Sequence, residues 1–182
     1  NSLPQIFLTV STFFPDPNVE STSVDGRAYR IPGAGESFST IRDGAGTGAS
    51  DADASEDGTT IVATATTDQY SDMRRNFFLF DSSSIPDTDT ISVAVFSVYV
   101  NNRQTTLTQS VGITSGIPAS NTAIVSADYA VANFGSTRFA ADIALSAMTD
   151  GQYNDWTLNA DGRTAVSKTG ITKFGLRLSG DI

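Results

Sequence analysis

The sequence predicts an all-β protein, a jelly-roll-like β-sandwich with one short helix. Three observations support this prediction. Short apolar or alternating runs recur along the 182 residues and are separated by turn residues. Ser and Thr make up about a quarter of the chain, and Thr suits the half-buried surface of a sheet. Only residues 159–168 have the signature of a helix, with Asn159 as its N-terminal cap and an end near Gly170.

The first element is a strand-like segment, residues 3–14, which ends at the sequence Pro15-Asp-Pro17. Ile6, Leu8 and Val10 share one face of this segment, and Phe7 lies on the other, as a period of two requires. We expect two units: an N-terminal strand at residues 1–14 and a sandwich domain at residues 15–182.

The remaining elements follow in order. Residues 18–31 are expected to be extended, with a turn at 24–27, and Ser126 is expected to begin a short helical turn. Four consecutive apolar residues at 77–80 predict a strand that is buried on both faces. The predicted strands are 37–42, 61–66, 76–81, 91–100, 105–114, 138–145, 153–158 and 171–178.

Composition excludes several functions. The net charge of −9, with 11 scattered basic residues, argues against nucleic acid, and the apolar runs are too short for membrane insertion. The chain has no Cys and no His, which rules out disulfides, thiol nucleophiles, Ser-His-Asp triads and metal sites built on imidazole or thiolate. No spacing motif indicates paired catalytic carboxylates, so we expect no enzyme.

Three stretches resemble the DNRLRE-type jelly-roll modules. Residues 75–100 contain Phe-Leu-Phe-Asp-Ser-Ser-Ser-Ile-Pro and end in Val-Tyr-Val, residues 153–178 contain Phe-Gly-Leu-Arg-Leu, and residues 14–26 resemble the opening of such a module. The resemblance implies a β-sandwich of bacterial secreted proteins, phage virion proteins or environmental extracellular fibril proteins. It implies no catalytic residues. We therefore expect a location outside the cell or on a cell or virion surface.

One departure from these modules suggests self-assembly. They usually continue past Phe-Gly-Leu-Arg to a closing strand, whereas this sequence stops at Ile182. A strand from a neighbouring copy would fill such a gap by β-augmentation, and a head-to-tail contact of this kind builds a filament. The expected donor residues are Ile6, Phe7, Leu8 and Val10, and the acceptor candidates are Phe77, Leu79, Phe174, Leu176 and Leu178. The alternatives are that segment 3–14 pairs within its own sheet or is a disordered arm.

Two weaker sites accompany this hypothesis. Asp51, Asp53, Ser55 and Asp57 place oxygens at alternating positions, as a Ca²⁺ loop does, but the EF-hand pattern then fails at Glu56 and Val62. The alternative is a solvated acidic loop, and no cofactor is required.

Tyr153, Asp155 and Trp156 could bind a sugar, although a single Trp is more commonly a core residue. The sequence thus predicts an extracellular structural subunit that forms a fibril by strand donation. The alternative is a carbohydrate-binding or adhesion module of a phage virion or bacterial surface protein, with glycans as partners.

Overall fold

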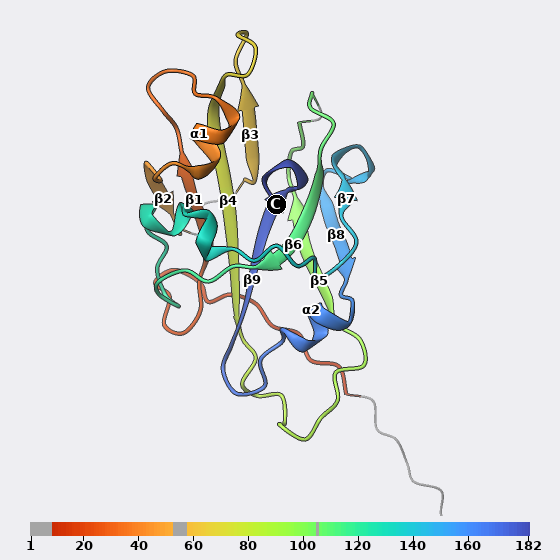
Figure 1. Cartoon of the computed structure of the whole chain (residues 1–182). Coiled ribbons are helices and arrows are strands. Elements are labelled where there is room, and N and C mark those ends of the chain that lie inside the picture. Colours follow the sequence, from red (N-terminus) through yellow and green to blue (C-terminus); the bar gives the residue numbers. More distant parts are fainter. Residues whose placement is uncertain (1–8, 53–57, 105) are drawn as a thin grey trace, which may run out of the picture.

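The computed structural model describes residues 9–52, 58–104 and 106–182. It is a β-sandwich in which a large antiparallel sheet packs against a small one (Figure 1). The prediction of an all-β sandwich is therefore confirmed. The described chain contains two short α-helices, where the sequence predicted one.

The larger sheet has seven strands in the described residues. Six of them follow the order β2-β1-β4-β9-β6-β7, and β3 pairs with residues 70–74 of β4, before the part of β4 that pairs with β9. Every pairing is antiparallel. The strands are β1 (Asp25–Arg30), β2 (Gly48–Ser50), β3 (Thr60–Ala63), β4 (Tyr70–Asp81), β6 (Ser110–Ser115), β7 (Ile143–Ala144) and β9 (Ile171–Leu178).

The smaller sheet consists of β5 (Val95–Val100) and β8 (Gln152–Thr157), which pair antiparallel. Phe96 of β5 and Trp156 of β8 are opposite each other and point toward the large sheet, where both are buried. The Phe96 ring lies 5.7 Å from that of Phe174 on β9, edge to face. The main core lies between the two sheets.

The opposite face of the large sheet carries a second apolar cluster. It is covered by helix α1 (Phe38–Asp43) and by the 3₁₀ turn η1 (Ser126–Tyr129), which contribute buried Ile41 and Tyr129. Phe134 packs on Phe77 of β4, with ring centroids 4.5 Å apart. The prediction of a strand buried on both faces is therefore confirmed for the face of Phe77 and Leu79, whereas Phe78 and Phe80 on the other face contact the core but are only half-buried.

Several sequence-based predictions of local structure were wrong. The stretch 37–42 is not a strand: Phe38–Asp43 form α1, because the Ser37 hydroxyl accepts a hydrogen bond from the Thr40 N–H and caps the helix. Asp25–Arg30 is strand β1, although its Asp-Gly pair is typical of turns. The long stretch 91–100 becomes a strand only from Val95, and 138–145 only at Ile143–Ala144.

The predicted helix is confirmed in a shorter form. Helix α2 spans Ala160–Thr164, and the Asn159 side chain accepts a hydrogen bond of 2.9 Å from the Gly162 N–H. Segment 171–178 is confirmed as strand β9, and the turn at Ser126 is confirmed as η1.

Candidate assembly interface

The small sheet has an exposed outer face. Val95 and Tyr99 of β5 and Tyr153 of β8 are between 51% and 62% exposed. The rings of Tyr99 and Tyr153 meet edge to face at 5.4 Å, and the Ser97 hydroxyl donates a 2.6 Å hydrogen bond to Asp155. These outward side chains stabilise the β5–β8 pairing from the solvent side.

The backbone of the small sheet presents two edges. The Leu158 N–H donates to the Ala94 carbonyl, and bonded pairs alternate along an antiparallel ladder. Because Phe96 is opposite Trp156, the β5 residues whose N–H and C=O groups bond to β8 are the even-numbered ones. The N–H and C=O groups of Val95, Ser97 and Tyr99 consequently point away from β8, toward the outer edge of the sheet.

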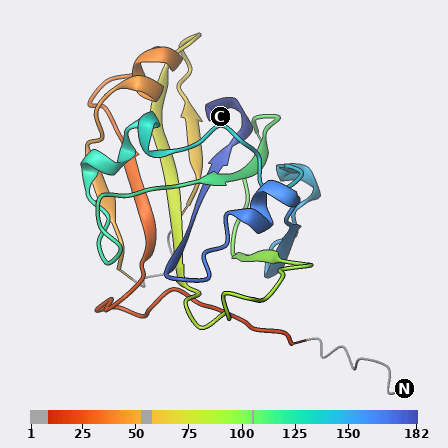
Figure 2. The ribbon, with the colours of Figure 1, turned by 60° about the horizontal axis from the view of Figure 1, so that its bottom comes forward.

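The described part of the N-terminal segment forms no strand with either sheet. Residues 9–14 carry no strand assignment, and Val10 and Phe14 are 84% and 72% exposed. Before it enters β1, the chain runs across one end of the sandwich, beside the β4–β5 connection (Figure 2). Of the predicted donor residues, Ile6, Phe7 and Leu8 lie outside the described residues, and Val10 is exposed to solvent.

Asp16 fixes the point where this segment joins the domain. Its carboxylate accepts hydrogen bonds from the Thr22 N–H at 2.7 Å and from the Ser21 hydroxyl at 2.9 Å. It also accepts one from the Ser23 hydroxyl at 3.3 Å. The Ser21 hydroxyl and then the Thr22 N–H lower the pKa of Asp16 to about 2. The segment thus leaves the domain from an anchored residue.

The structure separates the predicted acceptor residues. All five are between 0% and 7% exposed. Phe77 and Leu79 belong to the cluster beneath α1, whereas Phe174, Leu176 and Leu178 belong to the core between the sheets. Residues on opposite faces of one sheet cannot line a single groove, so the predicted acceptor groove needs correction. The exposed part of the small sheet is a better candidate.

The predicted sugar site is also divided. Trp156 is 1% exposed, and its indole N–H donates to the Val111 carbonyl at 3.3 Å, so its ring is a core group with no face open to a sugar. Tyr153 and Asp155 lie on the outer face of the small sheet. Their exposed aromatic neighbour is Tyr99, which no sequence pattern had singled out.

The predicted Ca²⁺ loop is described only at its start. The Asp51 carboxylate accepts a 2.8 Å hydrogen bond from the Ile124 N–H, and this fastens β2 to the loop before η1. Asp53, Ser55 and Asp57 lie outside the described residues. Among the residues that the structure describes, no three acidic side chains are grouped closely enough to hold a metal ion.

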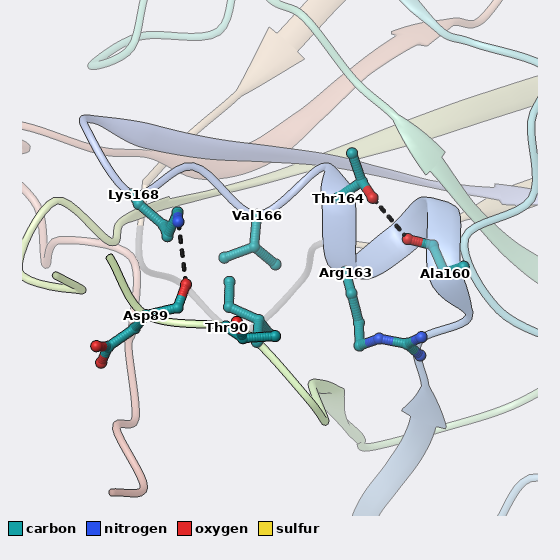
Figure 3. Close-up of a pocket in the computed structure, with 8 residues that line it drawn as sticks. Asp89, Thr90, Ala160, Arg163, Thr164, Val166 and Lys168 are labelled. Atoms are coloured by element: carbon teal, nitrogen blue, oxygen red, sulfur yellow. Dashed lines mark hydrogen bonds between the residues drawn. The ribbon is translucent and has the colours of Figure 1, made fainter. Parts of the chain in front are cut away.

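A surface cavity of about 450 Å³ lies between α2 and the β4–β5 connection (Figure 3). Its basic groups are already hydrogen-bonded. Lys168 donates to the carbonyls of Asp87 and Asp89, and Arg163 donates to the Leu158 carbonyl at 3.0 Å. The Lys168 bonds tie the segment that follows α2 to the β4–β5 connection, whereas the Arg163 bond ties α2 to the residue that follows β8.

Sequence reasoning missed a buried ionic cluster. Arg75 of β4 and Arg177 of β9 both contact Asp181, which lies just after β9. Burial lowers the pKa of Arg177 to about 10. The Arg75 guanidinium also stacks 4.2 Å from the centre of the Tyr129 ring. The cluster joins the large sheet to its covering layer and is structural.

Comparisons with protein-family models, curated proteins and solved structures find no match to this chain. The resemblance to DNRLRE-type modules therefore rests on the quoted motifs. No helix in the described ranges is long and apolar enough to cross a membrane.

Proposed function

We propose that this protein is a structural subunit that works outside the cell, or on a cell or virion surface. It polymerises head to tail when the N-terminal segment of one copy adds as a strand to the next. The observation that carries the proposal is the small sheet: in the described residues it has two strands and open backbone groups on β5, and residues 9–14 of the N-terminal segment form no strand.

The N-terminal segment has the composition of a strand that pairs with an apolar surface. Residues 1–15 contain no charged side chain, in a chain whose net charge is −9. Such a segment meets no electrostatic repulsion when it approaches an acidic neighbour. Burial of three or four of its large side chains, together with a strand's hydrogen bonds, supplies on the order of 5–10 kcal/mol before entropy costs.

Electron microscopy of the purified protein tests this function directly. The full chain is expected to form filaments, and the chain without residues 1–13 is expected to remain a soluble, folded monomer. Ile6→Asp should act like the deletion, because it places a charge on the face that includes Leu8 and Val10. Ser2→Asp adds the same charge outside residues 3–13 and should leave filaments intact. Filaments from the truncated protein would refute the proposal.

Carbohydrate binding is a second candidate function, supported by the exposed Tyr99–Tyr153 pair beside Asp155. A glycan array with Tyr153→Ala as the comparison protein tests it. Binding that disappears in this variant would support an adhesion module, and an empty array would remove the candidate.

A further inference from the structure

We propose that the acceptor of the donated strand is the outer edge of β5, where the backbone groups of Val95, Ser97 and Tyr99 receive residues 5–10 of the neighbouring copy. This inference rests on the proposed function and assigns the partner surface. The occupant is a second copy of this chain, because the chain itself contains an uncharged apolar segment that no described strand pairs with.

The edges of the large sheet are poor acceptors. At one end, β2 has only three residues, and β3, which pairs with β4 outside the main strand order, has four; both are too short a template for a six-residue strand. At the other end, β6 is covered by the chain that follows η1. The N–H groups of Phe139 and Gly135 donate to the carbonyls of Ile113 and Ser115 at 2.8 Å and 3.1 Å. Strand β7 then pairs with the first residues of β6.

The edge of β8 is partly covered and carries a charge. Ala140 forms a bridge with Leu158 at one end of the strand. Near the other end, the Asn154 side chain bonds both the N–H and the C=O of Thr149, at 2.9 Å and 3.0 Å, and holds that loop against β8. Asp155 is exposed in the middle. A charge in an edge strand is a usual protection against added strands.

The edge of β5 lacks every such protection. Residues 91–102 contain no charged residue and no proline. The β5 register contains no bulge, and no described segment pairs with the outward backbone groups of Val95, Ser97 and Tyr99. Soluble proteins rarely leave a six-residue strand of Val, Phe, Ser and Tyr open in this way, because it recruits other strands.

The space beside β5 matches the apolar face of the donor. Phe96 contacts Phe78 and Phe80 of β4 with ring centroids at 5.3 Å and 6.1 Å, whereas Trp156 of β8 bonds to β6. The open edge of β5 is therefore directed toward the β4 side of the large sheet. Phe78 and Phe80 are only half-buried there, as are Val98 and Val100 of β5. Donor residues Ile6, Leu8 and Val10 would extend this apolar layer.

Matched proline substitutions distinguish the two edges. Ser97→Pro removes one outward N–H of β5. Asp155 is the β8 residue opposite Ser97, so Asp155→Pro removes the equivalent outward N–H of β8. Both variants lose the same Ser97–Asp155 hydrogen bond. We expect Ser97→Pro to abolish filaments and Asp155→Pro to retain them, with melting temperatures of the two proteins within a few degrees. The reverse result would overturn the assignment to β5.

Cysteine cross-linking gives a second readout that does not depend on proline tolerance, because the chain has no cysteine of its own. A Thr9→Cys protein is mixed with a size-tagged Ser97→Cys protein under oxidising conditions, and a mixed disulfide dimer is expected. Asp155→Cys is the control, because β8 lies a further strand spacing of about 4.8 Å away.

The outcomes separate the two proposals. Filaments that cross-link through position 155 and not through 97 would overturn the β5 assignment while the strand-donation function stands. Absence of both filaments and cross-links would overturn both. A disulfide formed within single chains of the Thr9→Cys/Ser97→Cys double variant would show that the segment folds onto its own edge, and this also overturns the proposal.

Discussion

Arg75 of β4 and Asp181 form a doubly hydrogen-bonded ion pair, Nε to Oδ2 at 2.7 Å and Nη2 to Oδ1 at 2.5 Å, in which both side chains are buried. The same carboxylate lies 3.7 Å from Arg177, so one anion serves two buried cations. If either arginine is removed, Asp181 stays paired with the other one. If Asp181 is removed, two buried guanidinium groups lose their counterion.

The first prediction concerns this asymmetry. Asp181→Asn should lower the free energy of unfolding by about 3–5 kcal/mol, the usual cost of breaking a buried pair. The control is Asp142→Asn, because that carboxylate pairs with Arg138 at a partly exposed site and should cost less than about 1 kcal/mol. Denaturant unfolding of both proteins measures the difference. Equal losses would show that the buried cluster contributes no more than a surface pair.

A second prediction follows from Asp16. Because folding lowers its pKa from the ordinary 3.8 to about 2, the native state binds fewer protons than the unfolded state between these values. The contribution of Asp16 is present above about pH 4 and is lost as the pH falls toward 2. Asp16→Asn should therefore make the decline of the melting temperature between pH 4 and 2 shallower. Identical curves for the parent and Asp16→Asn proteins would contradict the assignment.

The sequence predicted the strands whose local pattern agrees with their packing, and it missed those that distant contacts decide. Residues 171–178 alternate clearly, and they form β9. Residues 37–42 contain the β-favouring pair Thr40-Ile41, yet Phe38–Asp43 form α1 because Ser37 caps the helix and Ile41 is buried over the large sheet.

The candidate site was predictable only in part. The apolar N-terminal segment is visible as a pattern, and so is the long run that contains β5. Distant segments of the chain decide which layer covers each face of β4 and β9, and no local pattern contains that information. The acceptor candidates were therefore mixed from both faces, and the open edge of β5 became apparent only from the pairing of the strands.

Gly175 provides a third prediction. A Cβ atom there would stand 2.6 Å from Cδ1 of Phe134, whose ring packs over β9 with the Arg177 guanidinium 4.9 Å from its centre. Gly175→Ala should destabilise the fold by about 1–3 kcal/mol, the usual cost of overpacking a core. At Gly170 the nearest atom is 3.9 Å away, so Gly170→Ala is the matched control. Thermal unfolding of the two variants measures the effect, and similar melting temperatures would show that Phe134 moves aside freely.

The fourth prediction tests whether Trp156 is a core residue. Trp156→Ala should cost about 3–5 kcal/mol of unfolding free energy, because it empties the space between Phe96 and β6. Tyr153→Ala removes an aromatic ring that is 62% exposed and should cost less than about 1 kcal/mol. Chemical denaturation followed by circular dichroism reports both values. A stable Trp156→Ala protein that loses glycan binding would restore the sugar-platform interpretation.

The last prediction uses a peptide in place of the neighbouring subunit. The protein without residues 1–13 retains the β5 edge and the Asp16 anchor, and a synthetic peptide of residues 3–13 should bind it as the missing strand. At a peptide concentration 100 times the dissociation constant, binding stabilises the fold by about 2.7 kcal/mol. For a domain of this size the melting temperature should therefore rise by roughly 5–10 °C. A peptide that carries Ile6→Asp and Leu8→Asp should give no shift, and neither peptide should stabilise the truncated Ser97→Pro protein. Equal shifts with both peptides would show non-specific adsorption and would contradict strand addition, because only the unmodified peptide can bury its apolar face beside Phe78.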